Sequence, residues 1–301
     1  MSNPTLFNTE SRNDDLGQLP ETSKDSKFKS LPARVITALV LAGVALGSYL
    51  AGTITFALFL LALFSFLLFE LCGLQTPAFS RSRKIAYVLL GCFFITGSMV
   101  FELANAYSID LDKIRNNSQL FVFVLMFVIV SGVLLRYKIY MVACGTGIFL
   151  AVLGHSMAFL GSKPIFLMIV LLIIGTDAGG YFAGKLIGGP KMFPSISPNK
   201  TWSGTIGGWA LSIIILIGFM YFWRDKLPTT YLVFYALAIS VFSQLGDLSI
   251  SAIKRKVGVK DSSNLLPGHG GFLDRFDGFI GAGVLIFFLT IMNFQPNIFD
   301  F

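Results

Sequence analysis

The sequence predicts an all-α integral membrane protein with about nine transmembrane helices and a polar cavity that faces the cytoplasm. Hydrophobic residues make up 54% of the 301 residues, and the mean hydropathy is +0.75. Both values exceed those of ordinary soluble domains. Apolar runs of the length needed to cross a bilayer recur from residue 35 onward, and the few charged residues gather in short segments between them.

Residues 1–30 are polar, carry mixed charges and show no apolar periodicity, so we expect a disordered cytoplasmic tail. Residues 31–301 are expected to form one polytopic membrane domain. The apolar runs predict helices at residues 35–51, 54–69, 85–104, 120–135, 139–160, 165–187, 204–223, 231–253 and 277–294. Only Gly52 and Thr53 separate the first two, and the second is short for a span of about 20 residues.

Lysine and arginine are distributed unevenly among the predicted loops. When the tail and every second loop are counted as one side, eighteen of the 23 cationic residues lie on that side and five on the other. Cytoplasmic loops carry the excess of positive charge. We therefore place the amino terminus and the loops 188–203 and 254–276 in the cytoplasm, at the plasma (inner) membrane. The net charge of +7 is explained in this way, and no nucleic-acid partner is expected.

Four acidic residues are predicted at similar depth on the cytoplasmic side. Asp247 lies about 24 Å along its helix from the outer end, since each residue adds 1.5 Å. Asp274 and Asp277 stand at the cytoplasmic start of the last helix, and Asp177 lies slightly past the midplane on the same side. Because an intramembrane carboxylate is costly unless it is paired or functional, we expect these groups to meet in one cytoplasm-facing cavity.

The segment 243–278 holds the densest set of charges. Asp247, Ser251 and Lys254 are spaced four and three residues apart, so they share one face of a helix. A carboxylate, a hydroxyl and an ammonium group in this order suit a polyanion with its metal. For Lys254, an ion pair within the helix or a side chain reaching to the lipid surface explains the pattern equally well.

A glycine-rich turn follows in the same segment. Gly270 and Gly271 allow backbone N–H groups to approach an oxyanion closely. A tight turn into the last helix explains the glycines equally well. His269 is a candidate metal ligand or acid, although a lone histidine more often has a structural hydrogen bond. Asp274 and Asp277 share a face of the opening turn and offer hard oxygen ligands for divalent cations.

A second polar stretch lies earlier in the chain. Asp177, Tyr181 and Lys185 recur every four residues on one helical face. Lys200 and Thr201 stand just before the next helix, where an ammonium group and a hydroxyl can face a phosphate.

These motifs resemble a known family. The run Ser251-x-Ile-Lys254-Arg255, four residues, Lys260-Asp-x-Ser-x-x-Leu-Pro-x-His269-Gly270-Gly271-Phe-x-Asp274-Arg275-Phe-Asp277 matches the signature of the phosphatidate cytidylyltransferases at every specified position. Asp177-x-x-x-Tyr181 and Ser197-Pro198-x-Lys200-Thr201 are also similar to that family. Ser203 departs from the pattern, because the family usually has glutamate there. A role of that glutamate in orienting Lys200 or a metal is therefore not expected in this chain.

The resemblance implies formation of CDP-diacylglycerol and pyrophosphate from CTP and phosphatidic acid, by a membrane-embedded homodimer. It implies that Asp247 and Asp274 bind Mg²⁺, with a monovalent companion ion such as K⁺. The catalytic portion would span about residues 165–294. The catalytic candidates are Asp247, Lys254, Arg255, Lys260, Asp274 and Asp277. The substrate-binding candidates are Asp177, Tyr181, Ser197, Lys200, Thr201, Ser251, His269, Gly270, Gly271 and Arg275.

Two other interpretations remain open at the level of sequence. One is a different CTP-using membrane enzyme that acts on an isoprenoid or another lipid acceptor. The other is an ion or metabolite carrier, since carriers also place acidic residues and broken helices within the bilayer. The position of the acids near one face, and the lack of an inverted repeat of residues 243–278, disfavour a carrier.

Overall fold

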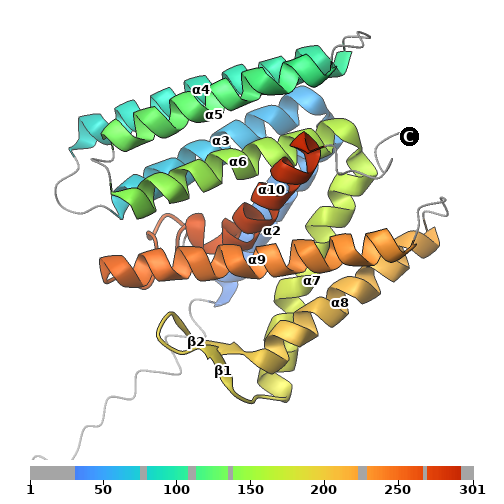
Figure 1. Cartoon of the computed structure of the whole chain (residues 1–301). Coiled ribbons are helices and arrows are strands. Elements are labelled where there is room, and N and C mark those ends of the chain that lie inside the picture. The colour runs from blue at the N-terminus through green and yellow to red at the C-terminus, as the bar shows by residue number, and fades with distance from the viewer. Residues whose placement is uncertain are drawn as a thin grey trace, which may run out of the picture.

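The computed structural model describes residues 31–74, 80–107, 113–134, 138–222, 229–266 and 270–292 (Figure 1). The predicted tail and His269 lie outside these ranges. Within them are α2 (Leu31–Ala51), α3 (Thr53–Gly73), α4 (Arg81–Tyr107), α5 (Lys113–Leu134), α6 (Ile139–Gly161), α7 (Lys163–Leu186), β1 (Lys191–Phe193), β2 (Ser197–Thr201), α8 (Trp202–Phe222), α9 (Thr229–Val257) and α10 (Leu273–Ile291).

The nine helices in these ranges correspond one to one with the apolar runs of the sequence. Six of them, α3, α4, α6, α7, α8 and α9, are long and apolar enough to cross a membrane, judged by length and composition. The apolar stretches of α2 and α5 are shorter, at Val35–Ala51 and Leu120–Leu134. The protein is thus a helical multi-pass membrane protein, as the composition predicted.

The fold is consistent with the all-α prediction, and one short two-stranded hairpin adds to the helices. The strands β1 and β2 form an antiparallel pair in which Lys191 faces Thr201 and Phe193 faces Ser197. The reason is local: Gly188 and Gly189 have φ angles of 68° and 106°, so the chain turns sharply after α7. Pro198 then disfavours a helix, and the second strand runs directly into α8.

Two helix ends also differ from the sequence prediction. α9 continues to Val257, and α10 begins at Leu273, four residues before the predicted start. Apolar runs mark only the apolar part of a helix, whereas the charged turns at these two ends remain helical. As a result Lys254 and Asp274 both stand on helices.

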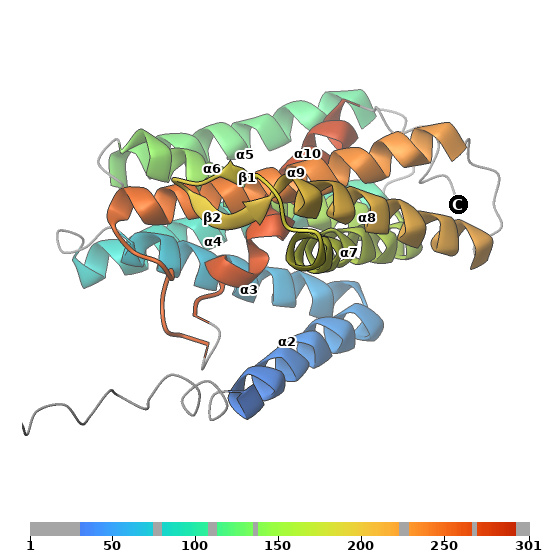
Figure 2. The same cartoon turned by 90° about the horizontal axis from the view of Figure 1, so that it is seen from below.

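The helices form two groups joined by α10. The helices α3, α4, α5 and α6 pack side by side, while α7 packs on α8 and both contact α9. α10 packs against α6 and α9 and so touches both groups (Figure 1). α2 packs on α3 and stands apart from the remaining helices (Figure 2).

Small residues bring α9 and α10 into backbone contact. A Cβ atom on Gly246 would lie 2.3 Å from the backbone oxygen of Asp277, and one on Gly281 would lie 1.9 Å from the backbone oxygen of Phe242. Glycine is therefore needed at both positions, as at other close helix crossings in membranes. This crossing sets Asp247 of α9 beside the first turns of α10.

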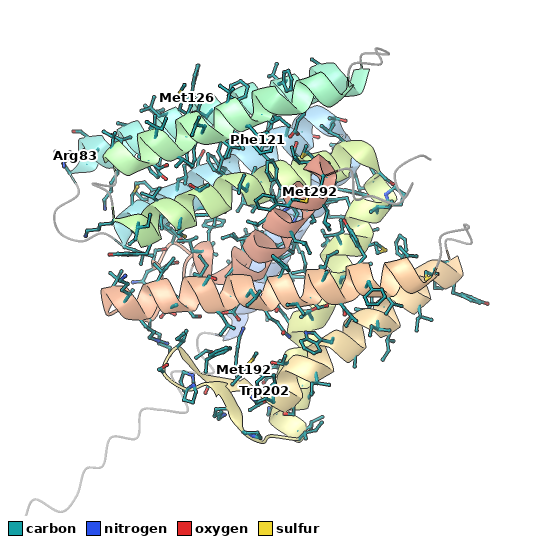
Figure 3. All side chains as sticks on the ribbon, viewed as in Figure 1. Arg83, Phe121, Met126, Met192, Trp202 and Met292 are labelled. Carbon is teal, nitrogen blue, oxygen red and sulfur yellow. The ribbon has the colours of Figure 1, made fainter. Side chains whose placement is uncertain are left out.

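The outer surface of the first group is apolar. Phe121 and Met126 of α5, labelled in Figure 3, have exposed fractions of 50% and 45%. Fully buried side chains such as Phe64 and Phe149 form the core between these helices. An apolar exterior over an apolar core is what a lipid environment requires.

Candidate functional site

Three of the four predicted acidic residues meet where α7, α9 and α10 come together. We call Asp177, Asp247 and Asp277 the carboxylate cluster. Each of the three carboxylates repels the other two electrostatically. Asp177 is accessible to solvent, although protein atoms surround most of it. Its carboxylate lies against the start of α10, because a Cβ atom on Gly278 would be 3.6 Å from its Oδ2.

Few positive charges balance this cluster. Lys200 Nζ lies 2.5 Å from Asp247 Oδ2, and Ser251 donates a hydrogen bond of 3.2 Å to Asp247 Oδ1. Asp277 Oδ1 accepts a bond of 2.8 Å from the backbone N–H of Gly278, and Lys254 attracts it more weakly. The hairpin β1–β2 positions Lys200, so a segment of sequence between two helices delivers the cation that pairs with Asp247.

A different arrangement surrounds Glu70, at the end of α3. Its side chain belongs to a residue only 2% exposed. One carboxylate oxygen accepts hydrogen bonds from Ser263 Oγ (2.6 Å) and Phe272 N (2.8 Å), and the other from Ser262 Oγ (2.9 Å) and Leu273 N (2.8 Å). The first N–H groups of a helix lack partners within that helix. Glu70, on α3, supplies the missing hydrogen-bond acceptors for the N–H groups at the start of α10.

Asp274 completes this arrangement, which we call the Glu70 cradle: Glu70, Asp274, Ser262, Ser263 and the backbone N–H groups of residues 271–273. Asp274 Oδ2 accepts bonds from Ser262 N (2.8 Å), Ser262 Oγ (3.0 Å) and Gly271 N (3.0 Å). Its Oδ1 accepts a bond of 2.6 Å from Lys254 Nζ. The side chain is thereby fixed on both oxygens.

The glycine-rich turn of the sequence analysis belongs to the cradle. A Cβ atom on Gly271 would lie 2.0 Å from Ser262 Oγ and 2.5 Å from Glu70 Oε2, so only glycine fits. Gly270 has a φ of 80° and accepts a backbone bond from Leu266. The N–H groups of residues 271–273 do approach oxyanions closely, and those oxyanions are the protein's own carboxylates. A role of Gly270 and Gly271 in substrate binding stays a prediction.

The two interpretations of Lys254 are now distinguished by its partner. Lys254 is 8% exposed and pairs with Asp274 of α10, which is neither an ion pair within α9 nor a lipid-facing position. Its neighbour Lys256 instead lies 4.0 Å from the centre of the Tyr140 ring. Arg255 donates to the backbone oxygens of Ile196 and Val259.

The remaining candidates lie around these two groups. Thr201 accepts a bond from Gly204 N and so caps α8, while Ser203 donates to the backbone oxygen of Gly188. Ser203 thus ties the start of α8 to the turn after α7, in the position where the sequence motif usually has an acid. Tyr181 is 62% exposed, and its ring lies beside the ammonium group of Lys185. Lys260 and Arg275 are exposed. Ser197 lies on β2, opposite Phe193 of β1.

Sequence reasoning missed Glu70. The signal was present, because Glu70 is the one charged residue in the apolar sequence of α3. A carboxylate in such a helix needs a partner or a function. The acidic residues selected from the sequence all lie in the second half of the chain. The partners of Glu70 are almost 200 positions away from it, with a separation of 192 for Ser262, so no local pattern connects them.

The donor atoms suit a hard cation. Within the part of the chain that the structure describes, no group of three or more histidine, cysteine, aspartate or glutamate side chains is arranged to hold a metal ion. The carboxylate cluster nevertheless offers only oxygen ligands and carries an excess of negative charge, which fits Mg²⁺ in type. Asp247 and Asp274 each form an ion pair with a lysine ammonium group, and their binding of Mg²⁺ stays a prediction.

The fold and these groups define a helical multi-pass membrane protein with a charged site suited to phosphate ligands. A family model described as "Cytidylyltransferase family" matches residues 32–292, and the chain belongs to that family. Phosphatidate cytidylyltransferase of Bacillus subtilis (strain 168) is 35% identical over 272 residues, which is 86% of this chain and 97% of the relative. The Brucella suis protein of the same name is 33% identical over 289 residues, covering 90% and 97%. That of Staphylococcus aureus (strain COL) is 46% identical over 123 residues, covering 41% and 47%.

Proposed function

We propose that this protein transfers the cytidylyl group of CTP to phosphatidic acid, which yields CDP-diacylglycerol and pyrophosphate. The observation that carries the proposal is the meeting of Asp247, Asp277, Lys200 and Lys254 at the crossing of α9 and α10, within a chain similar to phosphatidate cytidylyltransferases over most of its length. Four charged groups, three on the touching helices α9 and α10 and one on the hairpin β1–β2, suit a substrate with several phosphates.

The reaction is a displacement at phosphorus. A phosphate oxygen of phosphatidic acid attacks the α-phosphorus of CTP, the bond from that phosphorus to the bridging oxygen breaks, and the electron pair leaves with pyrophosphate. The nucleophile is already anionic, so the protein needs to align the two phosphates and offset their charge more than to remove a proton. The alignment of the two phosphates and the offset of their charge therefore depend mainly on cationic side chains, namely Lys200, Lys254, Arg255, Lys260 and Arg275.

Lys200 and Lys254 have a double use in this proposal. Mg²⁺, proposed at Asp247 and Asp274 with a companion ion such as K⁺, supplies positive charge for the phosphate oxygens of CTP. Those two aspartates now bind Lys200 Nζ and Lys254 Nζ at 2.5 and 2.6 Å. When the aspartates bind a cation, the two ammonium groups become available to phosphate oxygens close to the same place.

We further propose that the site faces the cytoplasm of the plasma (inner) membrane, where CTP is found, in a nine-span homodimer. The eighteen-to-five distribution of cationic residues supports this orientation. Lys191 on the hairpin is exposed and suits a topology probe. In a cysteine-free protein, Lys191→Cys should react with an impermeant thiol reagent only after the membrane is opened, and Asn297→Cys should react from outside. The reverse pattern would place the site away from cytosolic CTP.

The activity itself is tested with purified protein in detergent or vesicles. Incubation with CTP, Mg²⁺ and phosphatidic acid should release pyrophosphate and form CDP-diacylglycerol in equal amounts, and chelation of divalent cations should stop both. Isoprenoid phosphates offered in the same assay should not replace phosphatidic acid. Turnover of an isoprenoid acceptor alone would identify a different CTP-using enzyme, and no pyrophosphate with any lipid would remove the enzymatic proposal.

A further inference from the structure

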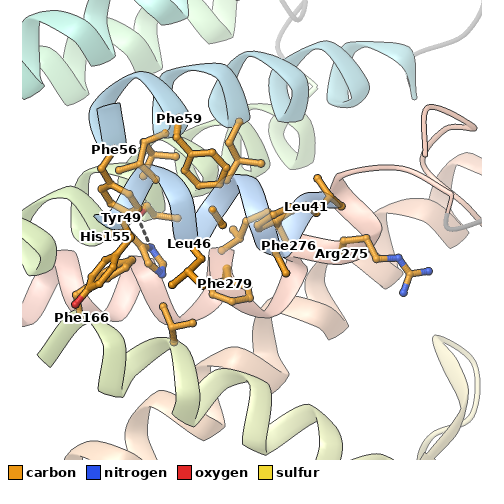
Figure 4. Close-up of a pocket in the computed structure, with 18 of the residues that line it drawn as sticks. Leu41, Leu46, Tyr49, Phe56, Phe59, His155, Phe166, Arg275, Phe276 and Phe279 are labelled. Atoms are coloured by element: carbon orange, nitrogen blue, oxygen red, sulfur yellow. Dashed lines mark hydrogen bonds between the residues drawn. The ribbon is translucent and has the colours of Figure 1, made fainter. Parts of the chain in front are cut away.

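An apolar chamber of about 590 Å³ lies between α2 and the rest of the helices. Helices α2, α3, α6, α7 and α10 all contribute to its wall. Tyr49, His155 and Arg275 are the only lining residues with polar side-chain atoms. In Figure 4, Arg275 stands at one end with its guanidinium group pointing away from the apolar side chains, whereas Phe166 and His155 lie toward the other end.

The room in the chamber comes from small residues on α2. Ala38, Ala42 and Ala45 line it, and their spacing of four and three residues puts them on one face of the helix. Opposite them stand large apolar side chains such as Phe276 and Phe279 of α10. A helix face of alanines across from a row of aromatic rings leaves an elongated space between them. The volume falls within the range of about 300–1,000 Å³ that is usual for ligand sites.

The chamber and the charged site meet at the first turn of α10. Arg275 follows Asp274 of the Glu70 cradle directly and stands two residues before Asp277 of the carboxylate cluster. One turn of one helix therefore contributes to the apolar chamber, the cradle and the cluster. A ligand with an anionic head and an apolar tail matches this geometry, since the head can lie at this turn while the tail follows α2 toward Tyr49.

We infer that the chamber binds one acyl chain of phosphatidic acid and that Arg275 marks its phosphate end. The inference rests on the proposed function and adds to it a place for the lipid tail. Contacts with the wall of the chamber would hold the substrate in one register, with its phosphate beside Arg275. The length of the chamber then limits how far the chain reaches, so the protein discriminates between acyl chains.

The first test fills the chamber midway. Ala45→Trp places a large ring in the space, and Val44→Trp is the matched control on the same helix, because Val44 is 55% exposed and does not line the chamber. With dioleoyl phosphatidate, Ala45→Trp should lower kcat/KM about tenfold, or about 1.4 kcal/mol, because the ring takes up the space that the acyl chain would occupy. With dioctanoyl phosphatidate the loss should be smaller, since a short chain fills less of the chamber. Equal chain-length preference in the two variants would overturn the inference.

The second test does not depend on turnover. A phosphatidate with a photoreactive diazirine at the end of a long acyl chain is bound to wild-type protein and irradiated. Cross-links should map to the far end of the chamber, at Tyr49, Phe56 or Phe166. Cross-links confined to outward residues such as Phe121 and Met126 would overturn the chamber. Cross-links in the chamber, together with no cytidylyl transfer from CTP, would overturn the proposed function and leave the chamber as a lipid site.

Discussion

The carboxylate cluster and the Glu70 cradle use the same chemical group in opposite ways. In the cradle, seven donor groups serve Glu70 and Asp274, and the single hydroxyl hydrogen of Ser262 is shared between the two carboxylates. In the cluster, Asp177, Asp247 and Asp277 repel one another. Among the described residues this repulsion is offset by Lys200, which pairs with Asp247 and also attracts Asp177, and by the weaker attraction of Lys254 for Asp277. In the cradle the carboxylate oxygens already have hydrogen-bond donors, whereas in the cluster the negative charge is only partly neutralised.

The difference separates groups that build the site from groups that act in it. Carboxylates whose lone pairs are filled by backbone N–H and hydroxyl groups hold Ser262, Ser263 and the start of α10 against α3, and they have little capacity for another ligand. A cation that binds beside carboxylates that repel each other lowers their electrostatic repulsion. Asp274 belongs to both classes, because its Oδ2 is fixed by the cradle while its Oδ1 holds an exchangeable lysine. The predictions below test this division.

The largest effect is expected from the two proposed metal ligands. Asp247→Asn and Asp274→Asn should each abolish most cytidylyl transfer, and the double variant should be little worse than either one, because parts of one catalytic unit are not additive. Only Asp274→Asn should also lower the thermal unfolding midpoint, since it alone disturbs the cradle. Turnover is measured against Mg²⁺ concentration. A folded single variant with wild-type turnover and Mg²⁺ dependence would contradict the assignment.

Glu70→Gln should lower the free energy of unfolding more than it affects cytidylyl transfer by the folded protein. The amide sets an NH₂ group against donors that now point to a carboxylate oxygen, at a cost of about 3 kcal/mol. Unfolding followed by temperature or denaturant measures this loss, and the apparent affinity for Mg²⁺ should change little in the fraction that stays folded.

Glu102→Gln on α4 is the matched control for that variant. Glu102 is also buried, and its carboxylate oxygens have no hydrogen-bond partner among the described residues, although Ser156 lies close. Its replacement should leave the midpoint almost unchanged. Equal destabilisation by the two substitutions would show that burial of an acid, and not the hydrogen bonds of the cradle, explains the effect.

Smaller losses are expected from single cations near the cluster. Lys200→Gln should reduce turnover about thirtyfold, the equivalent of about 2 kcal/mol for a hydrogen bond to a charged group. Arg255→Gln should cost less, because Arg255 is exposed and already bonds to two backbone oxygens. Expression and membrane insertion should stay normal for both. If both retain full turnover, these residues only anchor the protein to anionic lipid.

Local pattern in the sequence was enough to find the helices and the charged segments. Apolar runs located all nine helices of the described residues, because the need to bury apolar side chains acts along each segment by itself. Helical spacing correctly joined Asp247 to Ser251, which the structure shows hydrogen-bonded. It also placed Lys254 on the same face of its helix as Asp247, although the structure pairs Lys254 with Asp274. These features depend on neighbours within a few residues.

Contacts between distant segments were decided by the tertiary structure alone. Spacing placed Asp274 and Asp277 on one face, yet the packing of α10 between α3 and α9 turns Asp274 to Lys254 and Ser262, and Asp277 to Asp247. Glu70 reaches its partners only because α3 ends beside the start of α10. Which donors a carboxylate meets depends on how helices cross, and the crossing of α9 and α10 is set by the closeness that Gly246 and Gly281 permit.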